Sequence, residues 1–536
     1  MWRLCARSLH LVIGDNRKQM SLMVFQSTTP DINLTLIAPE LIIGVAGVIA
    51  MMIDAFARRG QRWLTGGLSI FALLSAGAAS IWLGTGAAGV HSAFNGMIVL
   101  DELRLSFTLI FVIVSILTVL IAAVWIDIEK LPAGEFHALL LFATCGMMLM
   151  ASAGDLVIVF LGLEILSIAT YVMAGFRRTD VRSNEASLKY FILGSFASAF
   201  LLYGIALVYG ATATDTLPGT TNIAAIAGRL NHSLYPALLL AGLAMMLVGF
   251  GFKVATAPFH VWTPDVYQGA PTPVTAFMAA GPKAAGFASF MRVFVFGFPL
   301  VTAVASTAGY AHKSWLGALA VMAALTMSVG NVVAIVQNNV KRMLAYSSIA
   351  HAGYALVGFV AAGAATDPEQ RNAALTSVTF YLLTYAVMNM GAFAIITLIA
   401  RGNDRHNEVD DYNGIGFLSP VLAFSLSLFL LSLLGMPLTA GFMGKVMVFT
   451  SAVRQGYVWL VVIGVLNTAI SAYYYLRLIV VMFFRERNAP WDPPPIRASI
   501  AVALILTIAS VFYLGLFPER VIRAFGARPT TPVLIR

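Results

Sequence analysis

Four charged residues lie inside apolar stretches of this chain and could move protons. Glu164 is the only carboxylate near the centre of such a stretch, and Lys253, Lys283 and Lys445 lie in or beside helices that glycine and proline interrupt. A charge near the centre of a bilayer costs at least ~2.5 kcal/mol, so each one needs a partner, water or a function. Burial favours the neutral form of a lysine, whereas a nearby carboxylate favours the charged form. We therefore predict that these four residues form a proton relay.

The alternative interpretation of these charges is structural, because buried ion pairs can simply tie helices together. Glu40 and Arg477 fit that interpretation, since each lies near the end of an apolar stretch, where snorkelling or interfacial pairing satisfies a charge. The other four charges lie on interrupted and repeated helices. Their position favours function over structure.

Three further residues could extend the relay. Lys189 could snorkel to the cytoplasmic surface or pair with Glu164 on the preceding helix, and we expect the pairing. His260 follows a helix break and titrates near neutrality, so it could carry a proton together with water. His351 lies in a run of small residues, and we interpret it as a hydrogen-bonded core histidine.

The composition is that of a membrane protein. Hydrophobic residues make up 59% of the 536 residues and charged residues only 11%, too few to cover a water-exposed surface. The net charge of +9 is spread singly between apolar stretches, which indicates topology signals rather than a nucleic-acid site. Cys5 and Cys145 lack the spacing of a metal site, and no Gly-rich phosphate loop joins a strand to a helix. We expect no metal, nucleotide or redox cofactor to bind this chain.

Apolar stretches near the ~20 residues that cross a bilayer recur along the chain. They fall at residues 33–54, 63–83, 104–126, 136–152, 154–176, 188–210, 235–257, 273–297, 315–337, 342–364, 373–400, 417–450, 457–484 and 498–517. Residues 1–30 form a basic tail, which could reflect a gene start placed before Met20 or Met23. Residues 31–520 form a single polytopic membrane domain, and residues 521–536 form a C-terminal tail. The sequence thus predicts an all-α membrane protein of about 14 transmembrane helices.

The loops indicate the orientation in the membrane. Fourteen Lys and Arg residues fall in alternate loops, at residues 58–62, 130, 177–182, 341–342, 401–405 and 485–497, and five fall in the intervening loops. The positive-inside rule places the first set in the cytoplasm. Both tails then lie outside although both are basic, so the tails run against the rule.

A repeated motif divides the membrane domain into two halves. The Ser-Ile-Ala copies at 167–169 and 348–350 each precede a segment that begins with Tyr and ends with Gly-Phe, so the two motifs cover 167–176 and 348–359. The halves cover approximately residues 136–297 and 315–484 with five spans each, and an odd number of spans inverts the second copy relative to the first. Each half contains one helix that Gly and Pro break. Broken backbone at membrane depth must line protein or water, as in transporters.

Three stretches of the sequence carry a family resemblance. They are Phe252–Val274 with its Asp-Val-Tyr-Gln-Gly-Ala-Pro segment, Val340–Tyr354 and Leu438–Lys445. The chain resembles, from about residue 33 to its end, the antiporter-like membrane subunits of NADH:quinone oxidoreductase, respiratory complex I, in the subunit N form. The resemblance implies that Glu164 is the family's key glutamate, that Lys253 and Lys445 are the lysines of the two broken helices, and that Lys283 is the central lysine between them.

The resemblance also implies a function and partners. The chain would be a proton-translocating subunit in a bacterial inner membrane, bound to related antiporter-like subunits, to a peripheral arm and to lipid. NADH, FMN, iron–sulfur clusters and quinone would react in other subunits. A cation/proton antiporter subunit, a membrane subunit of a hydrogenase-type complex and a scaffold that does not pump are the alternatives. Copurification with flavin and iron–sulfur subunits separates the first alternative from the main interpretation.

Overall fold

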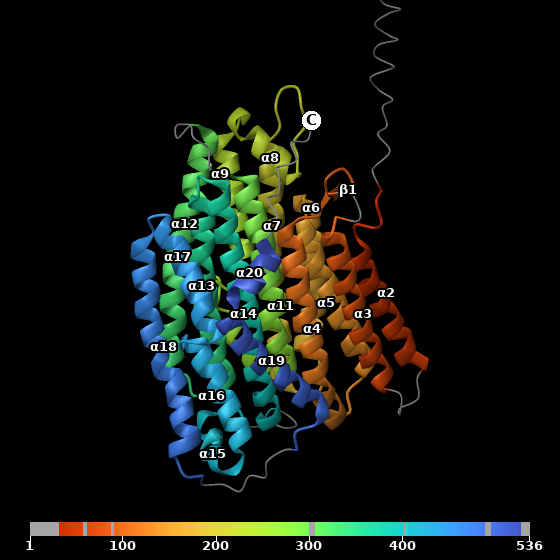
Figure 1. Ribbon diagram of the computed structural model, residues 1–536. Coiled ribbons are helices and arrows are strands. Elements are labelled where there is room, and N and C mark those ends of the chain that lie inside the picture. The colour runs from red at the N-terminus through yellow and green to blue at the C-terminus, as the bar shows by residue number, and fades with distance from the viewer. Residues whose placement is uncertain are drawn as a thin grey trace, which may run out of the picture.

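The computed structural model describes residues 32–56, 62–86, 91–299, 306–400, 404, 406–487 and 495–526. These residues form a bundle of long helices that lie side by side (Figure 1). Within them, twelve helices are long and apolar enough to cross a membrane, so the predicted membrane fold is confirmed in its main feature. The predicted tail at 1–30 and most of the tail at 521–536 lie outside the described residues.

The helices of the N-terminal part are α2 (Ala38–Phe56), α3 (Arg62–Gly84), α4 (Glu102–Glu129), α5 (Ala133–Ser152), α6 (Leu156–Ala174), α7 (Val181–Ala211), α8 (Ile223–Arg229), α9 (Pro236–Val254), α10 (Thr263–Gly269) and α11 (Thr272–Met291). A π-helical turn, η3 (Arg292–Phe296), extends α11, and a 3-10 turn, η2 (Leu230–His232), follows α8. Two short strands, β1 (Ser92–Ala93) and β2 (Ile98–Val99), pair antiparallel between α3 and α4.

The helices of the C-terminal part are α12 (Thr307–Ile335), α13 (Val340–Ala364), α14 (Pro368–Ala400), α15 (Ile415–Leu418), α16 (Pro420–Leu434), α17 (Ala440–Arg454), α18 (Val458–Phe484), α19 (Ala498–Leu516) and α20 (Pro518–Gly526), with a 3-10 turn η5 (Val409–Tyr412) before α15. Each predicted apolar stretch therefore corresponds to a helix, except that the stretch 417–450 contains both α16 and α17. Helix α11 and the 15-residue helices α16 and α17 are not among the twelve candidate spans.

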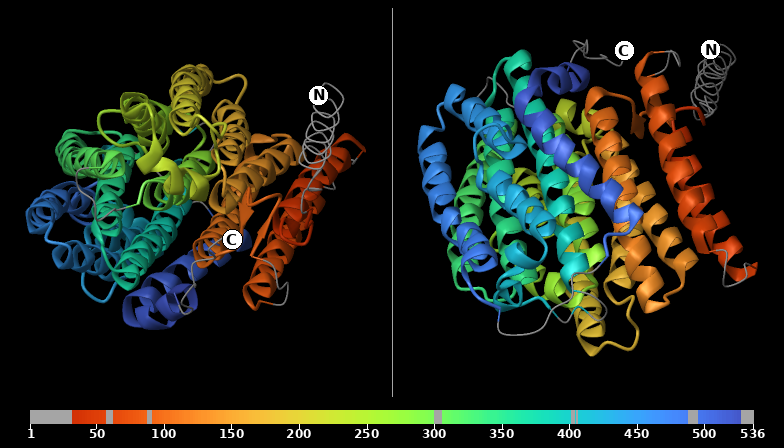
Figure 2. Two further views of the ribbon diagram at one scale, coloured as in Figure 1. Left: turned by 90° about the horizontal axis from the view of Figure 1, so that it is seen from above. Right: turned by 60° about the horizontal axis from the view of Figure 1, so that its bottom comes forward.

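Helices α13 and α14 form the centre of the bundle. In their most apolar windows 94% and 100% of the residues are buried, compared with 33% for α2, α7 and α18 at the periphery. Outer helices expose apolar side chains, as lipid or neighbouring subunits require. The central helices therefore keep nearly all of their side chains away from lipid. Helix α19 crosses obliquely over α14, α17 and α4 (Figure 2).

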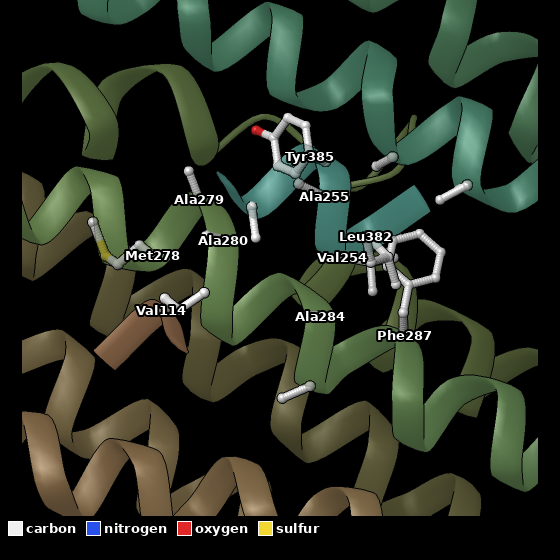
Figure 3. Packing of buried hydrophobic residues seen from close by; sticks show 14 of the residues in the cluster. Val114, Val254, Ala255, Met278, Ala279, Ala280, Ala284, Phe287, Leu382 and Tyr385 are labelled. Atoms are coloured by element: carbon white, nitrogen blue, oxygen red, sulfur yellow. The ribbon is translucent and has the colours of Figure 1, made fainter. Parts of the chain in front are cut away.

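Small residues allow several helices to approach closely. A Cβ atom built on Gly146 of α5 would lie 2.7 Å from the Gly162 carbonyl oxygen of α6, so these two backbones are in direct contact. Such contacts of small residues replace the hydrophobic driving force that is missing between helices in lipid. Alanines on α11, such as Ala280 and Ala284, serve the same purpose at the centre of the bundle, where α11 packs against α9 and α14 (Figure 3).

Two helices end in left-handed residues at the breaks expected from the sequence. Helix α9 ends at Ala255 (φ 60°), whose N–H bonds the carbonyls of Gly251 and Phe252. Helix α16 ends at Gly435 (φ 98°), a conformation that glycine adopts readily. Lys253 lies in the last turn of α9, and Lys445 lies in α17 directly after the second break. The breaks thus bring carbonyl ends of helices next to cationic side chains.

Candidate functional site

Lys253, the first lysine of the predicted relay, connects α9 to α6. Its ammonium donates a hydrogen bond of 2.8 Å to the hydroxyl of Ser167, and the Lys253 residue is 5% exposed. Glu164 lies one turn before Ser167 on α6, and its charge acts on Lys253. One carboxylate oxygen of Glu164 is buried and has no hydrogen-bond partner. Lys253 thus binds α6 through Ser167, one turn from Glu164, rather than through the carboxylate itself.

A cavity lies beside this lysine. It is a small cavity between α6, α7 and α9, where Ser167, Tyr171, Gly194, Gly249 and Lys253 line part of its wall. A water molecule occupies ~30 Å³ in the liquid, and it needs two to four polar partners when buried. The Ser167 hydroxyl, the Tyr171 hydroxyl and the lysine ammonium supply such partners. The cavity thus brings two hydroxyl groups to the Lys253 ammonium.

The second lysine connects the two halves of the chain. Lys283 is 3% exposed in the middle of α11, and its ammonium donates to both the backbone carbonyl of Ser348 (2.8 Å) and the Ser348 hydroxyl. Ser348 belongs to α13, in the second half. Lys253 packs against α11 one turn after Lys283, since a Cβ atom built on Gly286 of α11 would lie 3.3 Å from the Lys253 Cγ atom. Helix α11 thus brings the first two lysines to neighbouring turns.

The third lysine lies at the second helix break. The Lys445 ammonium donates to the carbonyls of Leu433 (3.2 Å) and Leu434 (2.8 Å) at the C-terminal end of α16. It also lies 4.8 Å from the centre of the Tyr354 ring, in cation–π distance. The C-terminal end of a helix is the negative end of its dipole, so it stabilises a cation. Lys445 is therefore held by neutral oxygens and an aromatic face, and no carboxylate of the described residues forms an ion pair with it.

A histidine lies between the second and third lysines. His351, one turn after Ser348, contacts the hydroxyls of Tyr381 (2.7 Å) and Tyr475 (3.3 Å), and the charges of Lys283 and Lys445 both reach it. Both ring nitrogens have partners, which confirms the interpretation as a hydrogen-bonded core histidine. The His351 ring also contacts the Tyr354 ring edge-on, with 5.7 Å between their centres. Ser348, His351 and Tyr354 of α13 thus lie between Lys283 and Lys445 on successive turns.

The sequence analysis missed the neutral residues of this site. Ser167 and Ser348 accept hydrogen bonds from Lys253 and Lys283, and they are the first residues of the two Ser-Ile-Ala motifs. The repeat itself was therefore a signal for both serines. Tyr354 and Tyr381 lack a comparable signal, because aromatic residues are common throughout the apolar stretches.

The two remaining candidates lie apart from these contacts. Lys189 is an exposed side chain that contacts Glu185 (2.8 Å) and Asp265 (3.1 Å), so the expected pairing with Glu164 is wrong. The physical reason is that Lys189 lies at the outer turns of α7, where carboxylates and solvent are available to its long side chain. His260 lies in the turn after α9, and its Nδ1 atom is buried without a hydrogen-bond partner.

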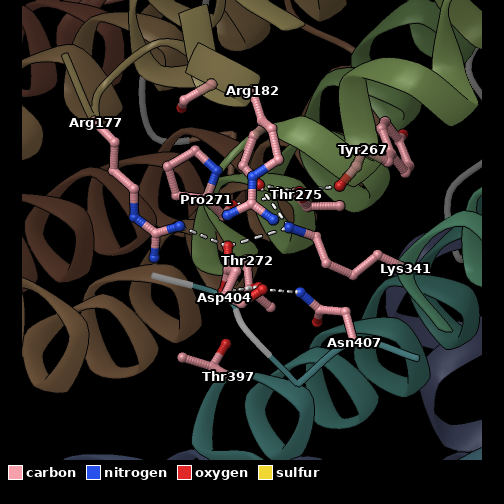
Figure 4. Close-up of polar contacts among 12 residues, drawn as sticks. Arg177, Arg182, Tyr267, Pro271, Thr272, Thr275, Lys341, Thr397, Asp404 and Asn407 are labelled. Atoms are coloured by element: carbon pink, nitrogen blue, oxygen red, sulfur yellow. Dashed lines mark hydrogen bonds and ion pairs between the residues drawn. The ribbon is translucent and has the colours of Figure 1, made fainter. Parts of the chain in front are cut away.

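A second group of buried charges lies at the end of the bundle that the loop charges assign to the cytoplasm. Asp404 accepts hydrogen bonds from Arg177 (2.9 Å), Thr272 (2.7 Å) and Lys341 (3.3 Å) (Figure 4). Arg177 also donates to Glu129 at the end of α4 through its Nε atom (2.6 Å). We call these five residues the Asp404 cluster. Glu40 and Arg104 form a separate buried ion pair at 2.9 Å, as the position of Glu40 predicted.

Electrostatics within the cluster keep Asp404 ionised. Asp404 lies in the loop after α14, outside the spanning helices, and is 7% exposed. Burial raises the pKa of Asp404, but the charges of Lys341 and Arg177 lower it by more, so the pKa lies below the ordinary carboxyl value. Within the described residues, no group of three His, Cys, Asp or Glu side chains could hold a metal ion.

Comparisons with known proteins are consistent with this architecture. A family profile described as "NADH:quinone oxidoreductase/Mrp antiporter, TM" matches residues 153–471. A protein from Trichlorobacter lovleyi named NADH-quinone oxidoreductase subunit N is 45% identical over 494 residues, which are 92% of this chain and 96% of the relative. A protein from Solibacter usitatus named NADH-quinone oxidoreductase subunit N 1 is 43% identical, over 90% of this chain and 94% of the relative.

Solved structures show the same fold. A chain of respiratory complex I from Thermus thermophilus, with bound aureothin, is 35% identical with a TM-score of 0.74 and covers 92% of this chain and 100% of its own length. A chain of an archaeal membrane-bound sulfane sulfur reductase is 25% identical with a TM-score of 0.77, over 91% of this chain and 95% of its own. A chain of the Mrp complex from a Dietzia species is 20% identical and shares the fold (TM-score 0.76), over 92% of this chain and 97% of its own.

Proposed function

Since this chain belongs to the NADH:quinone oxidoreductase/Mrp antiporter family, we propose that it is the subunit N of a proton-translocating NADH:quinone oxidoreductase. Its relatives of that name match it over almost their whole length, and a chain of complex I matches its fold. The chain is thus a membrane-arm subunit whose partners are related antiporter-like subunits. NADH oxidation by FMN and iron–sulfur clusters, and quinone reduction, take place in other subunits of the complex, and this chain holds no redox cofactor. The complex lies in a bacterial inner membrane.

The proposed topology has 14 spans in which two five-helix halves are inverted repeats. Helix α11 and the broken pair α16–α17 add two spans to the twelve candidates. Corresponding helices pack alike in the two halves: α5 packs on α6 as α12 packs on α13, and α7 packs on α9 as α14 packs on α16 and α17. This similarity supports repeats near residues 136–297 and 315–484.

One observation carries the proposed mechanism: buried lysines follow one another from the first half of the chain to the second, and each donates to a neutral oxygen. Lys253 donates to Ser167 and Lys283 donates to Ser348, while Lys445 lies over the ring of Tyr354 on α13. Lys283 and Lys445 are held by neutral partners, so neither leaves an unpaired carboxylate beside it when it gives up its proton. A proton can therefore pass from a charged lysine to a neutral one through hydroxyls and water.

The redox reaction in the other subunits drives this relay by changing the charge pairing of Glu164. When Glu164 is ionised and close, it stabilises the Lys253 ammonium, and when it moves away or is neutralised, Lys253 releases its proton. The proton then passes to neutral Lys283 and onward to Lys445. His260 could exchange protons with Lys253 through water, whereas Lys189 lies too exposed to share the path and binds acidic residues instead.

A cation/proton antiporter would use the same fold, and the Mrp chain shows that the fold alone does not separate the two functions. The relatives at 43–45% identity favour the NADH:quinone oxidoreductase. Copurification of a tagged chain decides between them. Flavin and iron–sulfur subunits in the purified complex support the proposal, and their absence favours the antiporter or hydrogenase-type alternative.

The relay itself is tested with Lys253→Met, which keeps the length of the side chain and removes its charge. Lys189→Met is the matched control, because it removes an exposed lysine of the same half. Membrane vesicles are assayed for NADH-driven proton pumping and NADH:quinone turnover, and native gels measure the assembled complex. We expect Lys253→Met to lose both activities in an assembled complex while Lys189→Met retains them. Full pumping by Lys253→Met would overturn the relay.

A further inference from the structure

We propose that Asp404 is a positioning residue for proton transfer between the two halves: it holds the cytoplasmic ends of α6, α11 and α13 together and so keeps Lys283 in contact with Ser348. This inference rests on the proposed function, because it concerns a step of the same relay. Nothing in the sequence distinguishes Asp404, which lies in a polar loop after α14.

The Asp404 carboxylate binds one residue from each of three helices. Arg177 follows the C-terminal end of α6, Thr272 is the first residue of α11, and Lys341 is the second residue of α13. In Figure 4 these side chains converge on the carboxylate from different sides. The carboxylate therefore fixes the relative depth of three helix ends in the bundle.

Each of these three helices carries a group of the relay. Helix α6 carries Glu164 and Ser167, α11 carries Lys283, and α13 carries Ser348. Seven residues separate Lys341 from Ser348, or ~10 Å along a helix at ~1.5 Å per residue. A helix transmits an axial shift of its end over such a distance almost unchanged. A displacement of α11 against α13 at the Asp404 cluster therefore moves Lys283 against Ser348.

Other contacts extend this anchorage to the broken helix. Lys341 also donates to the Ala270 carbonyl at 2.6 Å, so it ties α13 to the segment that follows α10. Asn407 donates to the Asp404 carbonyl (2.7 Å), and the Asn407 carbonyl accepts from the N–H of Val340. Asp404 and Asn407 are thus anchored together at the start of α13. Movement of these two residues and of α13 is coupled.

The charges of the cluster balance, which explains how it can be buried. Arg177 and Lys341 supply two positive charges, and Glu129 and Asp404 supply two negative ones. Removal of one partner of a buried pair leaves the other charge uncompensated. Lys341 without Asp404 would keep only the Ala270 carbonyl among the acceptors seen here. It would turn toward solvent and release the end of α13.

The experiment compares Asp404→Asn with Asp404→Glu and with the control Glu40→Gln in membranes that contain the complete complex. Glu40→Gln also removes the carboxylate of a buried ion pair, but its partner Arg104 lies in the first turn of α4, at the opposite end of that helix from Glu129 of the Asp404 cluster. Turnover is measured per assembled complex, in H₂O and in D₂O. Electron transfer from NADH to a soluble acceptor shows that the peripheral arm is intact.

We expect Asp404→Asn to slow NADH:quinone turnover and pumping per assembled complex by about 10- to 100-fold, since a misplacement of ~1 Å can cost ~10² in rate. The solvent isotope effect on turnover rises as proton transfer becomes rate-limiting. Asp404→Glu restores part of the rate, and Glu40→Gln changes neither quantity. An assembled Asp404→Asn complex with the turnover and isotope effect of Glu40→Gln overturns the proposal.

Two further variants make the result decisive. If Asp404→Asn does not assemble, Thr272→Val replaces it, because this change removes only the α11 contact and leaves both ion pairs. A wild-type isotope effect in Thr272→Val then overturns the positioning role. Lys283→Met is assayed in parallel. If Lys283→Met is inactive and the Asp404 variant is normal, the positioning role alone fails, and if both are normal, the proposed relay fails.

Discussion

Two sets of buried charges in this protein differ in what holds them. Lys283 and Lys445 contact carbonyls, a hydroxyl and an aromatic ring, and no carboxylate among the described residues lies within ion-pair distance of them. Arg177 and Lys341 of the Asp404 cluster contact carboxylates directly. A paired charge resists a change of protonation, whereas a cation on neutral partners can lose its proton at smaller cost. The comparison separates groups that move protons from groups that hold helices.

The two sets also lie at different depths. Lys283 is in the middle of α11, whereas Lys341 and Thr272 are at the starts of their helices. Water and headgroups are close at a helix end, so charged groups there cost less and form pairs readily. Lys283, in the middle of its helix, is far from the water and headgroups that stabilise charges at helix ends. The protein therefore keeps its least stabilised charges where the proposed chemistry needs them.

The largest expected effect comes from Lys283→Met. Methionine is similar in length and apolar, so the substitution removes an uncompensated buried cation and its only loss is the contact to Ser348. We expect turnover and pumping to be abolished while the amount of assembled complex on native gels stays at least at the wild-type level. A variant that fails to assemble would contradict the comparison, because it would make Lys283 a structural residue.

Glu40→Gln should show the opposite behaviour, with a large effect on stability and little on turnover. Arg104 is 2% exposed and would lose its charged partner, which costs about 3–5 kcal/mol for a buried pair. The Leu36 carbonyl still accepts a hydrogen bond from Arg104, so the expected loss of stability lies toward the lower end of that range. Thermal inactivation of the purified complex measures the stability, and turnover per assembled complex measures the activity. A selective loss of turnover would place this pair in the pathway.

The sequence predicted the fold well because apolar stretches of the right length are themselves the cause of membrane insertion. The two broken helices were predicted because glycine and proline interrupt a helix through their own backbone properties. Even the left-handed ends at Ala255 and Gly435 lie within the predicted breaks. The number of spans was harder to predict, because a broken span such as 417–450 contains two helices that are each too short to cross alone.

The sequence identified the deep charges and missed their partners. The sequence singles out Lys253, Lys283 and Lys445 because a charged side chain in an apolar stretch has a high free-energy cost. A serine such as Ser348 has a small cost there and is common, so it does not stand out. Pairing between distant segments, such as Arg177 with Asp404, is set by the tertiary fold and leaves no local pattern. Arg177 and Lys341 were interpreted only as topology signals. The structure adds to that role the binding of Asp404.

Ser348→Ala should have a smaller effect than Lys283→Met. It removes the hydroxyl that accepts from Lys283 but keeps the backbone carbonyl at 2.8 Å, so the lysine retains one of its two acceptors. A hydrogen bond to a charged group contributes about 1.5–3 kcal/mol, and partial compensation by the carbonyl should leave about a fivefold loss of turnover. Steady-state NADH:quinone assays on assembled complex measure it. A complete loss would mean that the hydroxyl itself carries the proton.

The smallest expected effect is the influence of mild acid on the Asp404 cluster. The pKa of Asp404 in the folded protein lies below its ordinary value, so Asp404 stabilises the fold fully above the unfolded pKa near ~3.9 and loses that contribution only as the pH falls through the lower folded value. Between pH 8 and pH 5 the difference in thermal inactivation between wild type and Asp404→Asn should therefore stay constant. Differential scanning measurements at several pH values in that range test this constancy. A difference that shrinks already between pH 7 and pH 5 would show that Asp404 takes up a proton there, and the cluster would then belong with the groups that change protonation rather than with those that hold the helices.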